Sequence, residues 1–292
     1  MAFLILLLGI LRIIQANCNK LTSSCMTSAQ IFFRYGTFFE GAAAAFSLLY
    51  LFIFGFYGLN TATVICAVLS ALCYTTELIT SLEALKHAPL VLCNMGAMGG
   101  GIVLVSILGI FFFDEPMTLI QWAGVAAFFL ASYCLSPSEN RTDSAVRRIS
   151  RKGWSILVLN FLINGAASFL SKYFAVHVEN GNPALYSCLT YSVSSVLFLL
   201  LLIFQRRRVK EHAPLPQKLY LYGTVLGAAC ASIVYLVTSL SRTVPVVIIN
   251  TVPSAISIIG CLFIGALLFK EKITRKNLLG VLLGILSVAM IV

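Results

Sequence analysis

The sequence predicts an all-α integral membrane protein with ten transmembrane helices, arranged as two inverted repeats of five helices. The first observation behind this prediction is composition, because 60% of the 292 residues are hydrophobic and 10% are charged. A soluble domain is about 45–50% apolar and about 25% charged, so the composition excludes that class. The second observation is an internal repeat, since the segment 86–124 reappears at 242–280 without a gap. The third is a reversal of charge between the two copies.

The repeat keeps polar residues, prolines and glycines in a fixed order, which chance matches between apolar segments do not produce. The paired positions are Lys86/Arg242, Pro89/Pro245, Asn94/Asn250, Gly109/Gly265, Phe113/Phe269, Glu115/Glu271, Thr118/Thr274 and Gly124/Gly280. Self-similarity of this kind indicates a duplicated structural unit. At the central turn, Asp114-Glu115-Pro116 is acidic, whereas Lys270-Glu271-Lys272 is basic. Basic residues stay on the cytoplasmic side of a membrane, so we expect the two copies to span it in opposite orientations.

Ten segments have the length of about 20 mostly apolar residues that a transmembrane helix needs. In the first half they cover residues 2–19, 32–53, 61–85, 89–113 and 117–136. In the second half they cover residues 153–173, 184–204, 219–241, 245–269 and 275–292. The predicted parts are therefore a first repeat at 1–136, a basic linker at 137–152 and a second repeat at 153–292. Residues 2–14 lack the positively charged start of a signal peptide, and we expect them to belong to a retained first span.

Lysine and arginine gather in the connections that follow the odd-numbered spans. These residues are Lys20, Arg34, Lys86, Arg141, Arg147, Arg148, Arg151, Lys152, Arg206, Arg207, Arg208, Lys210, Lys218, Lys270, Lys272, Arg275 and Lys276. The positive-inside rule then places these connections in the cytoplasm, with both termini outside, in a multi-pass protein of the cell membrane. These topology signals account for the net charge of +10, so we do not expect nucleic acid as a partner.

Two five-helix halves, each with a Glu-x-[Met/Ile]-Thr turn before a glycine-bearing last helix, resemble the EamA-like branch of the drug/metabolite transporter superfamily. The matching stretches are Glu115–Gly124, Glu271–Gly280, Leu85–Pro89, Ser241–Pro245, Asn17–Lys20 and Ser171-Lys172. The resemblance covers nearly the whole chain and implies the fold of a transporter. It does not imply one substrate, because the family is associated with amino acids, drugs and nucleotide-sugars. Members are commonly described with both termini in the cytoplasm, whereas the charges here predict the reverse.

The sequence offers no constellation typical of catalysis, and we expect neither an enzyme, a metal site nor a cofactor. The nine cysteines are scattered singly, without the paired spacing of a zinc or redox motif. His87, His177 and His212 have no metal-ligand partner at helical spacing. No glycine-rich phosphate loop precedes a Lys-Ser or Lys-Thr pair, and we expect the glycine run at 99–101 to permit close helix contact instead.

Three charged residues lie inside predicted spans: Arg12 in the first, Glu40 in the second and Glu77 in the third. A charge in hydrocarbon is costly, so such residues face a cavity or a partner. At about 1.5 Å per residue, all three lie roughly 2–6 Å from the membrane midplane. We therefore expect that they can form one shared polar cluster.

Two interpretations of this cluster stay open. Arg12 and one glutamate could form a structural pair, with no group left for a substrate. Alternatively, Arg12 pairs with one carboxylate, and the other binds a cationic or zwitterionic substrate or carries a coupling proton, because a low-dielectric site favours protonation of a carboxylate. A third case is that one of the three residues lies at the membrane interface.

The candidate binding residues of the second half are uncharged. They are Asn160, Asn164, Tyr191, Tyr235 and Asn250. Asn160 and Asn164 are four residues apart and share a helix face, where they could line a cavity or bond a neighbouring helix. Asn250 could pin helix packing or touch a ligand. We expect the carboxylates of the two Glu-x-x-Thr turns to be structural and to favour the start of the helix that follows each turn.

Together these features predict a secondary transporter that moves a small polar organic metabolite or drug by alternating access. A proton or an exchanged solute would supply the energy, because no nucleotide-binding motif is present. Its partners would be the lipid bilayer and a small-molecule substrate. The alternative is a non-transporting membrane subunit, or a lipid-carrier flippase-like protein that acts with a partner. Carboxylates that face water would favour transport, and carboxylates sealed by packing would favour the alternative.

Overall fold

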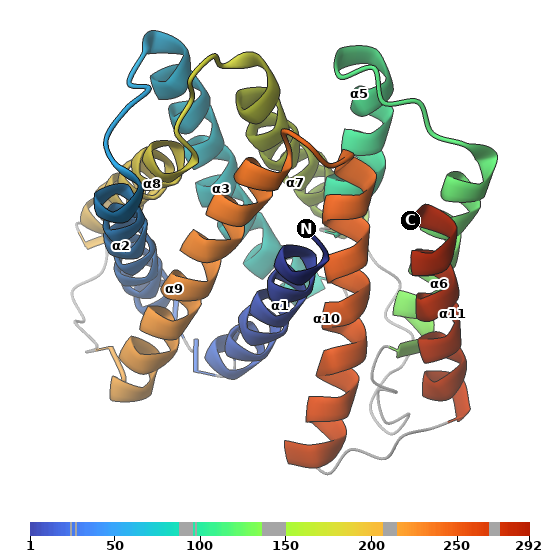
Figure 1. The fold of residues 1–292 in the computed structure, drawn as a ribbon. Coiled ribbons are helices and arrows are strands. Elements are labelled where there is room, and N and C mark those ends of the chain that lie inside the picture. The colour runs from blue at the N-terminus through green and yellow to red at the C-terminus, as the bar shows by residue number, and fades with distance from the viewer. Residues whose placement is uncertain are drawn as a thin grey trace. The chain divides into compact units, whose positions relative to one another are not determined.

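The computed structural model describes residues 1–23, 25–26, 28–87, 96, 98–135, 150–206, 215–268 and 275–292. Within these ranges the regular structure is helical, and no strand occurs (Figure 1). The helices are α1 (Ala2–Ser23), α2 (Ala29–Phe54), α3 (Thr61–His87), the π-helix η1 (Gly100–Leu104), α5 (Val105–Phe112), α6 (Leu119–Leu135), α7 (Arg151–His177), α8 (Pro183–Arg206), α9 (Gln217–Leu240), α10 (Val246–Leu268) and α11 (Arg275–Ile291).

Seven of the described helices are long and apolar enough to cross a membrane. They cover residues 2–19, 30–54, 61–81, 151–177, 183–205, 217–240 and 246–264. Helix is present within each of the ten predicted ranges. The all-helical, multi-pass class is therefore confirmed, whereas ten crossings and inverted repeats remain predictions. The start of the fourth predicted span, the turn at 269–274 and most of the linker at 137–152 lie outside the described residues, and Asn94 and Glu271 lie there too.

The chain forms two compact units, and each unit takes helices from both halves of the sequence. Unit 1 comprises residues 1–75 and 170–243, and unit 2 comprises residues 76–169 and 244–292. The boundaries between the units fall inside α3 and α7. Each of these two long helices therefore contributes one end to unit 1 and the other end to unit 2.

Polar side chains fix where the helices of unit 1 begin. The Ser28 hydroxyl accepts a hydrogen bond from the Ile31 amide at the start of α2. Asn60 Oδ1 accepts one from the Thr63 amide, 2.7 Å away, at the start of α3. Asn182 does the same at the start of α8, ahead of a proline at the first helical position. These residue types are preferred caps because they satisfy amides that have no partner inside the helix.

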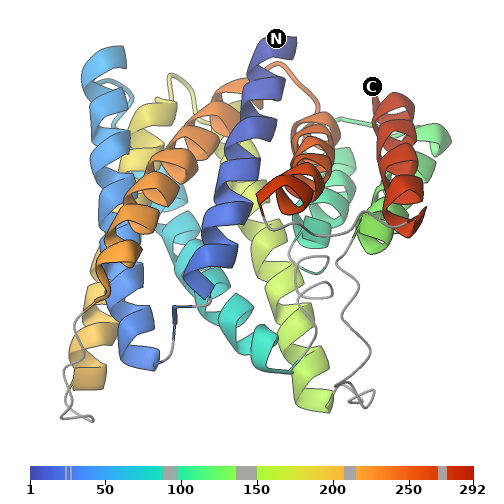
Figure 2. The same cartoon turned by 90° about the horizontal axis from the view of Figure 1, so that it is seen from below.

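In unit 1, α2 packs against α8 and α9, and α1 packs against α9 (Figures 1 and 2). Small residues make the close approaches. A Cβ atom on Gly227 would lie 2.9 Å from the Ala43 amide nitrogen, so α9 touches the backbone of α2 there. At Gly58 φ is +73°, and a Cβ atom would lie 2.3 Å from the Asn180 carbonyl oxygen. This loop therefore needs glycine both for its conformation and for its packing.

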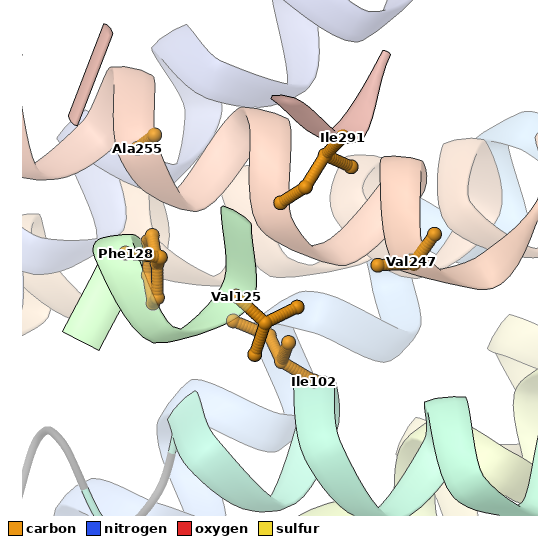
Figure 3. Close-up of a cluster of buried hydrophobic side chains, with 6 residues drawn as sticks. All are labelled: Ile102, Val125, Phe128, Val247, Ala255 and Ile291. Carbon is orange, nitrogen blue, oxygen red and sulfur yellow. The ribbon is translucent and has the colours of Figure 1, made fainter. Parts of the chain in front are cut away.

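In unit 2, α6 packs along α11, and α10 contacts η1, α5, α6 and α11. A cluster of buried apolar side chains joins η1, α6, α10 and α11 (Figure 3). Its buried members are Ile102, Val125, Phe128, Val247, Ala255 and Ile291. Figure 3 shows Val125 of α6 next to Ile102 of η1. Van der Waals contacts of this kind hold helices together in lipid, where water does not drive association.

The Glu115 turn is structural, as predicted, but its carboxylate stabilises a different helix. Thr118 and Gln121 form a reciprocal capping box at the start of α6, with amide-to-side-chain distances of 3.0 and 3.2 Å. Glu115 Oε2 instead accepts a hydrogen bond from the amide of Val246, 2.9 Å away, at the first residue of α10. The prediction that Glu115 serves the helix that follows it was therefore wrong, because the carboxylate reaches a helix of the second half.

Candidate functional site

The predicted site residues divide between the two units. Those of unit 1 are Arg12, Glu40, Tyr191 and Tyr235. Those of unit 2 are Glu77, Asn160, Asn164 and Asn250. A hydrogen bond brings Glu77 and Asn164 together, and the single polar cluster expected of the three charged residues stays a prediction.

In unit 2, two rungs of hydrogen bonds join α3 to α7. Asn164 Nδ2 donates to Glu77 Oε1 at 2.6 Å. One turn away, Asn160 Nδ2 donates to Thr80 Oγ1 at 3.1 Å and to Ser81 Oγ at 2.7 Å. The rungs align because residues three or four apart share one face of a helix. We call these five residues, Glu77, Thr80, Ser81, Asn160 and Asn164, the α3–α7 seam.

The hydrogen bonds of Thr80 define which end of the Asn160 amide faces α3. The Thr80 hydroxyl donates to the backbone carbonyls of Thr76 and Glu77, at 2.9 and 3.1 Å. It therefore accepts from Asn160, which must present its N–H groups to α3. Asn160 is 2% exposed, and its Oδ1 atom has no hydrogen-bond partner in the part of the chain that the structure describes. The Asn160 side chain therefore donates from its nitrogen to α3, while its buried oxygen has no described donor.

The π-helix η1 lies against α7 beside the seam. A Cβ atom on Gly100 would lie 1.9 Å from the Phe161 carbonyl oxygen, and one on Gly101 would lie 2.8 Å from Asn164 Oδ1. A Cβ atom on Gly165 of α7 would likewise lie 2.9 Å from the Gly100 carbonyl oxygen. The expected role of the glycine run in close helix contact is confirmed at these positions. Short π-helical turns occur frequently at functional sites, and this one lies next to the Glu77–Asn164 pair.

A charged group lies at the C-terminal end of α3, six residues beyond Glu77. Glu83 Oε1 lies 3.4 Å from His87 Nε2 and 3.8 Å from Lys152 Nζ of α7. These side chains are about 30–70% exposed, and ion pairs at such positions contribute about 0–1 kcal/mol. A solvent-accessible ionic group therefore lies just beyond the Ser81 end of the seam.

In unit 1, the charged residues lie on helices that share α9 as a neighbour. Glu40 on α2 is 2% exposed, and Arg12 on α1 is half-buried. Gln15, one turn after Arg12, donates to Cys230 Sγ of α9 at 3.4 Å. A carboxyl group inside a candidate span and this deeply buried is a candidate functional position.

The remaining predicted residues pack within their own units. Tyr191 is buried and stacks on Tyr74, with ring centroids 6.1 Å apart. Tyr235 stacks on both Tyr50 and Phe54 of α2, at 5.2 and 5.0 Å. Asn250 is buried on α10, and its backbone carbonyl accepts from the Ser254 hydroxyl. Pro253 interrupts the hydrogen bonding of α10 within one turn of Asn250.

One buried cation was not among the predicted site residues. Lys172 is 3% exposed in unit 1, and its ammonium donates to the Ser241 carbonyl at 2.7 Å, at the C-terminal end of α9. A cation there is favourable because the last carbonyls of a helix lack partners and carry partial negative charge. The sequence placed Lys172 at a span end. The predicted span 153–173 ends one residue after Lys172, whereas α7 continues to His177.

The fold and these buried polar groups define the class as a multi-pass, all-helical membrane protein with charged residues inside its apolar helices. Residues 151–292 match the model of the EamA-like transporter family, which is part of the drug/metabolite transporter superfamily. No curated protein matches the chain. Among solved structures, one described simply as a crystal structure of a protein aligns with a TM-score of 0.77 at 14% identity, over 98% of this chain and 97% of that one. This likeness shows a shared fold.

Proposed function

We propose that the protein is a secondary transporter that moves a small polar organic metabolite or drug across the cell membrane by alternating access. The match of residues 151–292 to a transporter family and the seven apolar helices support this proposal. The observation that carries it is the carboxylate of Glu77, held by Asn164 inside a pair of candidate spans. A charge is costly at that depth, and a protein keeps one there chiefly for function.

The proposal includes ten spans in two inverted repeats, at residues 1–136 and 153–292. Helices at equivalent positions of the two repeats are neighbours within both units, which supports this arrangement. In unit 1 the second helices of the repeats, α2 and α8, pack together, and in unit 2 the fifth helices, α6 and α11, do so. Equivalent helices meet in this way when the repeats are related by a two-fold axis.

In this mechanism the intramembrane carboxylates hold either the solute or a proton. Glu77 and Glu40 each lie in a different unit. Asn164 fixes the orientation of the Glu77 carboxylate, so that binding does not have to order a flexible side chain. Release of a proton or of an exchanged solute on one side would supply the energy. Asn160, Asn164, Arg12 and Asn250 complete the proposed set of binding residues, with Tyr191 and Tyr235 as supports.

The proposal is tested by uptake into proteoliposomes that contain the purified chain. A panel of amino acids, alkylamines, nucleosides and organic acids should include at least one solute with saturable uptake. We expect Glu77→Gln to lower that uptake by about tenfold or more, because it removes the charge from the binding group. Glu83→Gln, at the solvent-accessible end of the same helix, serves as the matched control and should stay within about twofold of wild type.

Two results would contradict this proposal. Absence of uptake for every solute, in protein shown to be folded, would favour the non-transporting subunit that acts with a partner. Uptake that is unchanged in both Glu77→Gln and Glu40→Gln would remove the intramembrane carboxylates from the mechanism.

A further inference from the structure

We infer that Ser150 is phosphorylated by a protein kinase that selects serines preceded by arginine, and that the phosphate draws Lys152 away from Glu83. The inference goes beyond the proposed function, because it concerns the connection between the two repeats and not the binding of a solute. It rests on the predicted topology, which places residues 137–152 in the cytoplasm. ATP and protein kinases are present in that compartment.

The residues before Ser150 form a charge pattern that protein kinases recognise. Arg147 and Arg148 lie three and two residues before the serine. Kinases select substrates partly by such patterns, and two arginines there complement a kinase with an acidic substrate groove. The positive-inside rule accounts for the number of basic residues in this connection, but it does not require them to precede a serine. Residues 147–149 lie outside the described residues, so it is their sequence alone that marks Ser150 as a substrate.

Ser150 itself is described, and its position suits modification. It is exposed directly before α7, and its hydroxyl accepts a hydrogen bond from the Gly153 amide at 3.1 Å. Arg151 and Lys152 are exposed too, so the residues that follow the serine are open to another protein. The first turn of a helix opens readily, because its amides have no partners within the helix. The hydroxyl can therefore reach a kinase once the contact with Gly153 opens.

The modification is a phosphoryl transfer with ATP as the co-reactant. The Ser150 Oγ atom attacks the γ-phosphorus of Mg–ATP, so that an O–P bond forms and the bond from this phosphorus to the β–γ bridging oxygen breaks. ADP leaves, and the hydroxyl proton passes to the catalytic base of the kinase. The product carries a charge of about −1.5 to −2 at pH 7 directly before α7.

A phosphate on Ser150 stabilises the start of α7. The first amides of a helix lack intrahelical partners and carry partial positive charge. Phosphate oxygens accept from such amides more strongly than a hydroxyl does, because charge-assisted hydrogen bonds are about twice as strong as neutral ones. Phosphorylation should therefore hold the first turn of α7 more firmly than the contact between Ser150 and Gly153 does.

The phosphate also competes with Glu83 for Lys152. In the unmodified protein Lys152 Nζ lies 3.8 Å from Glu83 Oε1, and the Lys152 side chain is 70% exposed. An ion pair this exposed is weak, and a phosphate dianion attracts an ammonium group more strongly than one carboxylate does. The C-terminal end of α3 thereby loses its ionic contact with α7.

The first test treats the purified full-length protein with Mg–ATP and a kinase of this arginine-directed class, and locates the phosphate by peptide mass spectrometry. We expect phosphate on Ser150, and Arg148→Ala should slow its incorporation by about tenfold or more. Ser144→Ala is the matched control, because Ser144 also follows an arginine by three residues but has an aspartate directly before it. This variant should stay within about twofold of wild type. Phosphate on Ser144 in place of Ser150, incorporation that does not depend on Arg148, or no phosphate at all would overturn the inference.

Hydrogen exchange, followed by mass spectrometry, tests the structural consequence. In phosphorylated wild type the amides at the start of α7 should exchange at least about threefold more slowly than in the unmodified protein, and those near Glu83 should exchange faster. Kinase treatment of Ser150→Ala should change neither rate. Slower exchange at both places would mean that the phosphate strengthens the contact between α3 and α7. That result, or unchanged exchange at both places, would overturn the role given to Lys152.

Labelling from one side of the membrane separates failure of the topology from failure of kinase recognition. Ser150→Cys should react with a membrane-impermeant maleimide only after cells are permeabilised. Wild type, labelled in parallel, gives the background from the nine native cysteines. Labelling of Ser150→Cys in intact cells would overturn the inference, because the serine would then lie on the side without ATP. These measurements do not depend on transport, so their outcome is independent of the proposed function.

Discussion

The two ends of the Asn160 amide show what one residue contributes in a low-dielectric setting. Its N–H groups hold two hydroxyls of α3, and its oxygen stays buried without a described donor. Interhelical hydrogen bonds in membranes contribute about 0.6 kcal/mol on average. The hydrogen bonds of Asn160 to α3 are therefore a modest source of stability.

A double-mutant cycle between Asn160 and Ser81 tests this account of the rung. We expect Ser81→Ala to lower the free energy of unfolding by about 1 kcal/mol in wild type, because it leaves a buried N–H group unpaired. In an Asn160→Leu background the same change should cost almost nothing. The measurement is equilibrium unfolding in detergent. Equal costs in the two backgrounds would mean that the 2.7 Å contact does not couple the residues.

Residue types alone revealed three of the five seam residues. The spacing of Asn160 and Asn164 predicted one shared helix face, and Glu77 was evident as a charge in an apolar span. Thr80 and Ser81 were missed, because hydroxyl residues in apolar helices commonly bond their own backbone, as Thr80 also does. Lys172 was misplaced because its partner, the Ser241 carbonyl, lies 69 residues away, and no local pattern reports so distant a contact.

At the scale of elements, the start of α10 depends on a turn of the other half of the sequence. The Val246 amide is one of the helix N-terminal groups without an intrahelical partner, and the Glu115 carboxylate both accepts its hydrogen bond and complements the helix dipole. A Cβ atom on Gly109 would lie 3.9 Å from the same carboxylate, so the turn and the helix end are packed together.

Removal of this contact should destabilise unit 2. We expect Glu115→Ala to lower the free energy of unfolding by about 1 kcal/mol, the usual cost of losing a helix cap. Glu115→Gln keeps an acceptor oxygen and loses only the charge, so it should cost about half as much or less. Thermal unfolding of the two variants beside wild type measures both effects. An alanine variant as stable as wild type would show that water replaces the carboxylate.

Helices themselves were well predicted, because length and apolar composition suffice to identify a span. The predicted segment 184–204 corresponds to α8 at Pro183–Arg206, and 219–241 corresponds to α9 at Gln217–Leu240. The neighbours of each helix could not be predicted. Apolar residues surround these helices on all sides, so periodicity does not mark the face that meets a partner.

At the scale of the whole molecule, neither half of the sequence contains a complete unit. Unit 1 needs α1 and α2 together with α8 and α9, and unit 2 needs α6 together with α10 and α11. We therefore expect residues 1–143 and 144–292, expressed as separate chains, to aggregate when either is made alone. Co-expressed, the two should co-purify as one species in size-exclusion chromatography. A stable, monodisperse single half would contradict this interleaved arrangement.

Because each unit combines helices from both halves of the sequence, early helices are made well before the later helices that they pack against. Helix α2 ends at Phe54, and the first of its packing partners, α8, begins at Pro183. At about 5–20 residues per second, the ribosome leaves α2 without that partner for a time on the order of 10 s. During this interval α2, which carries the Glu40 carboxyl group that is 2% exposed in the finished protein, lacks the neighbours that the second half supplies. We therefore expect cells that lack an insertion factor able to shelter polar spans until late helices arrive to make the protein poorly.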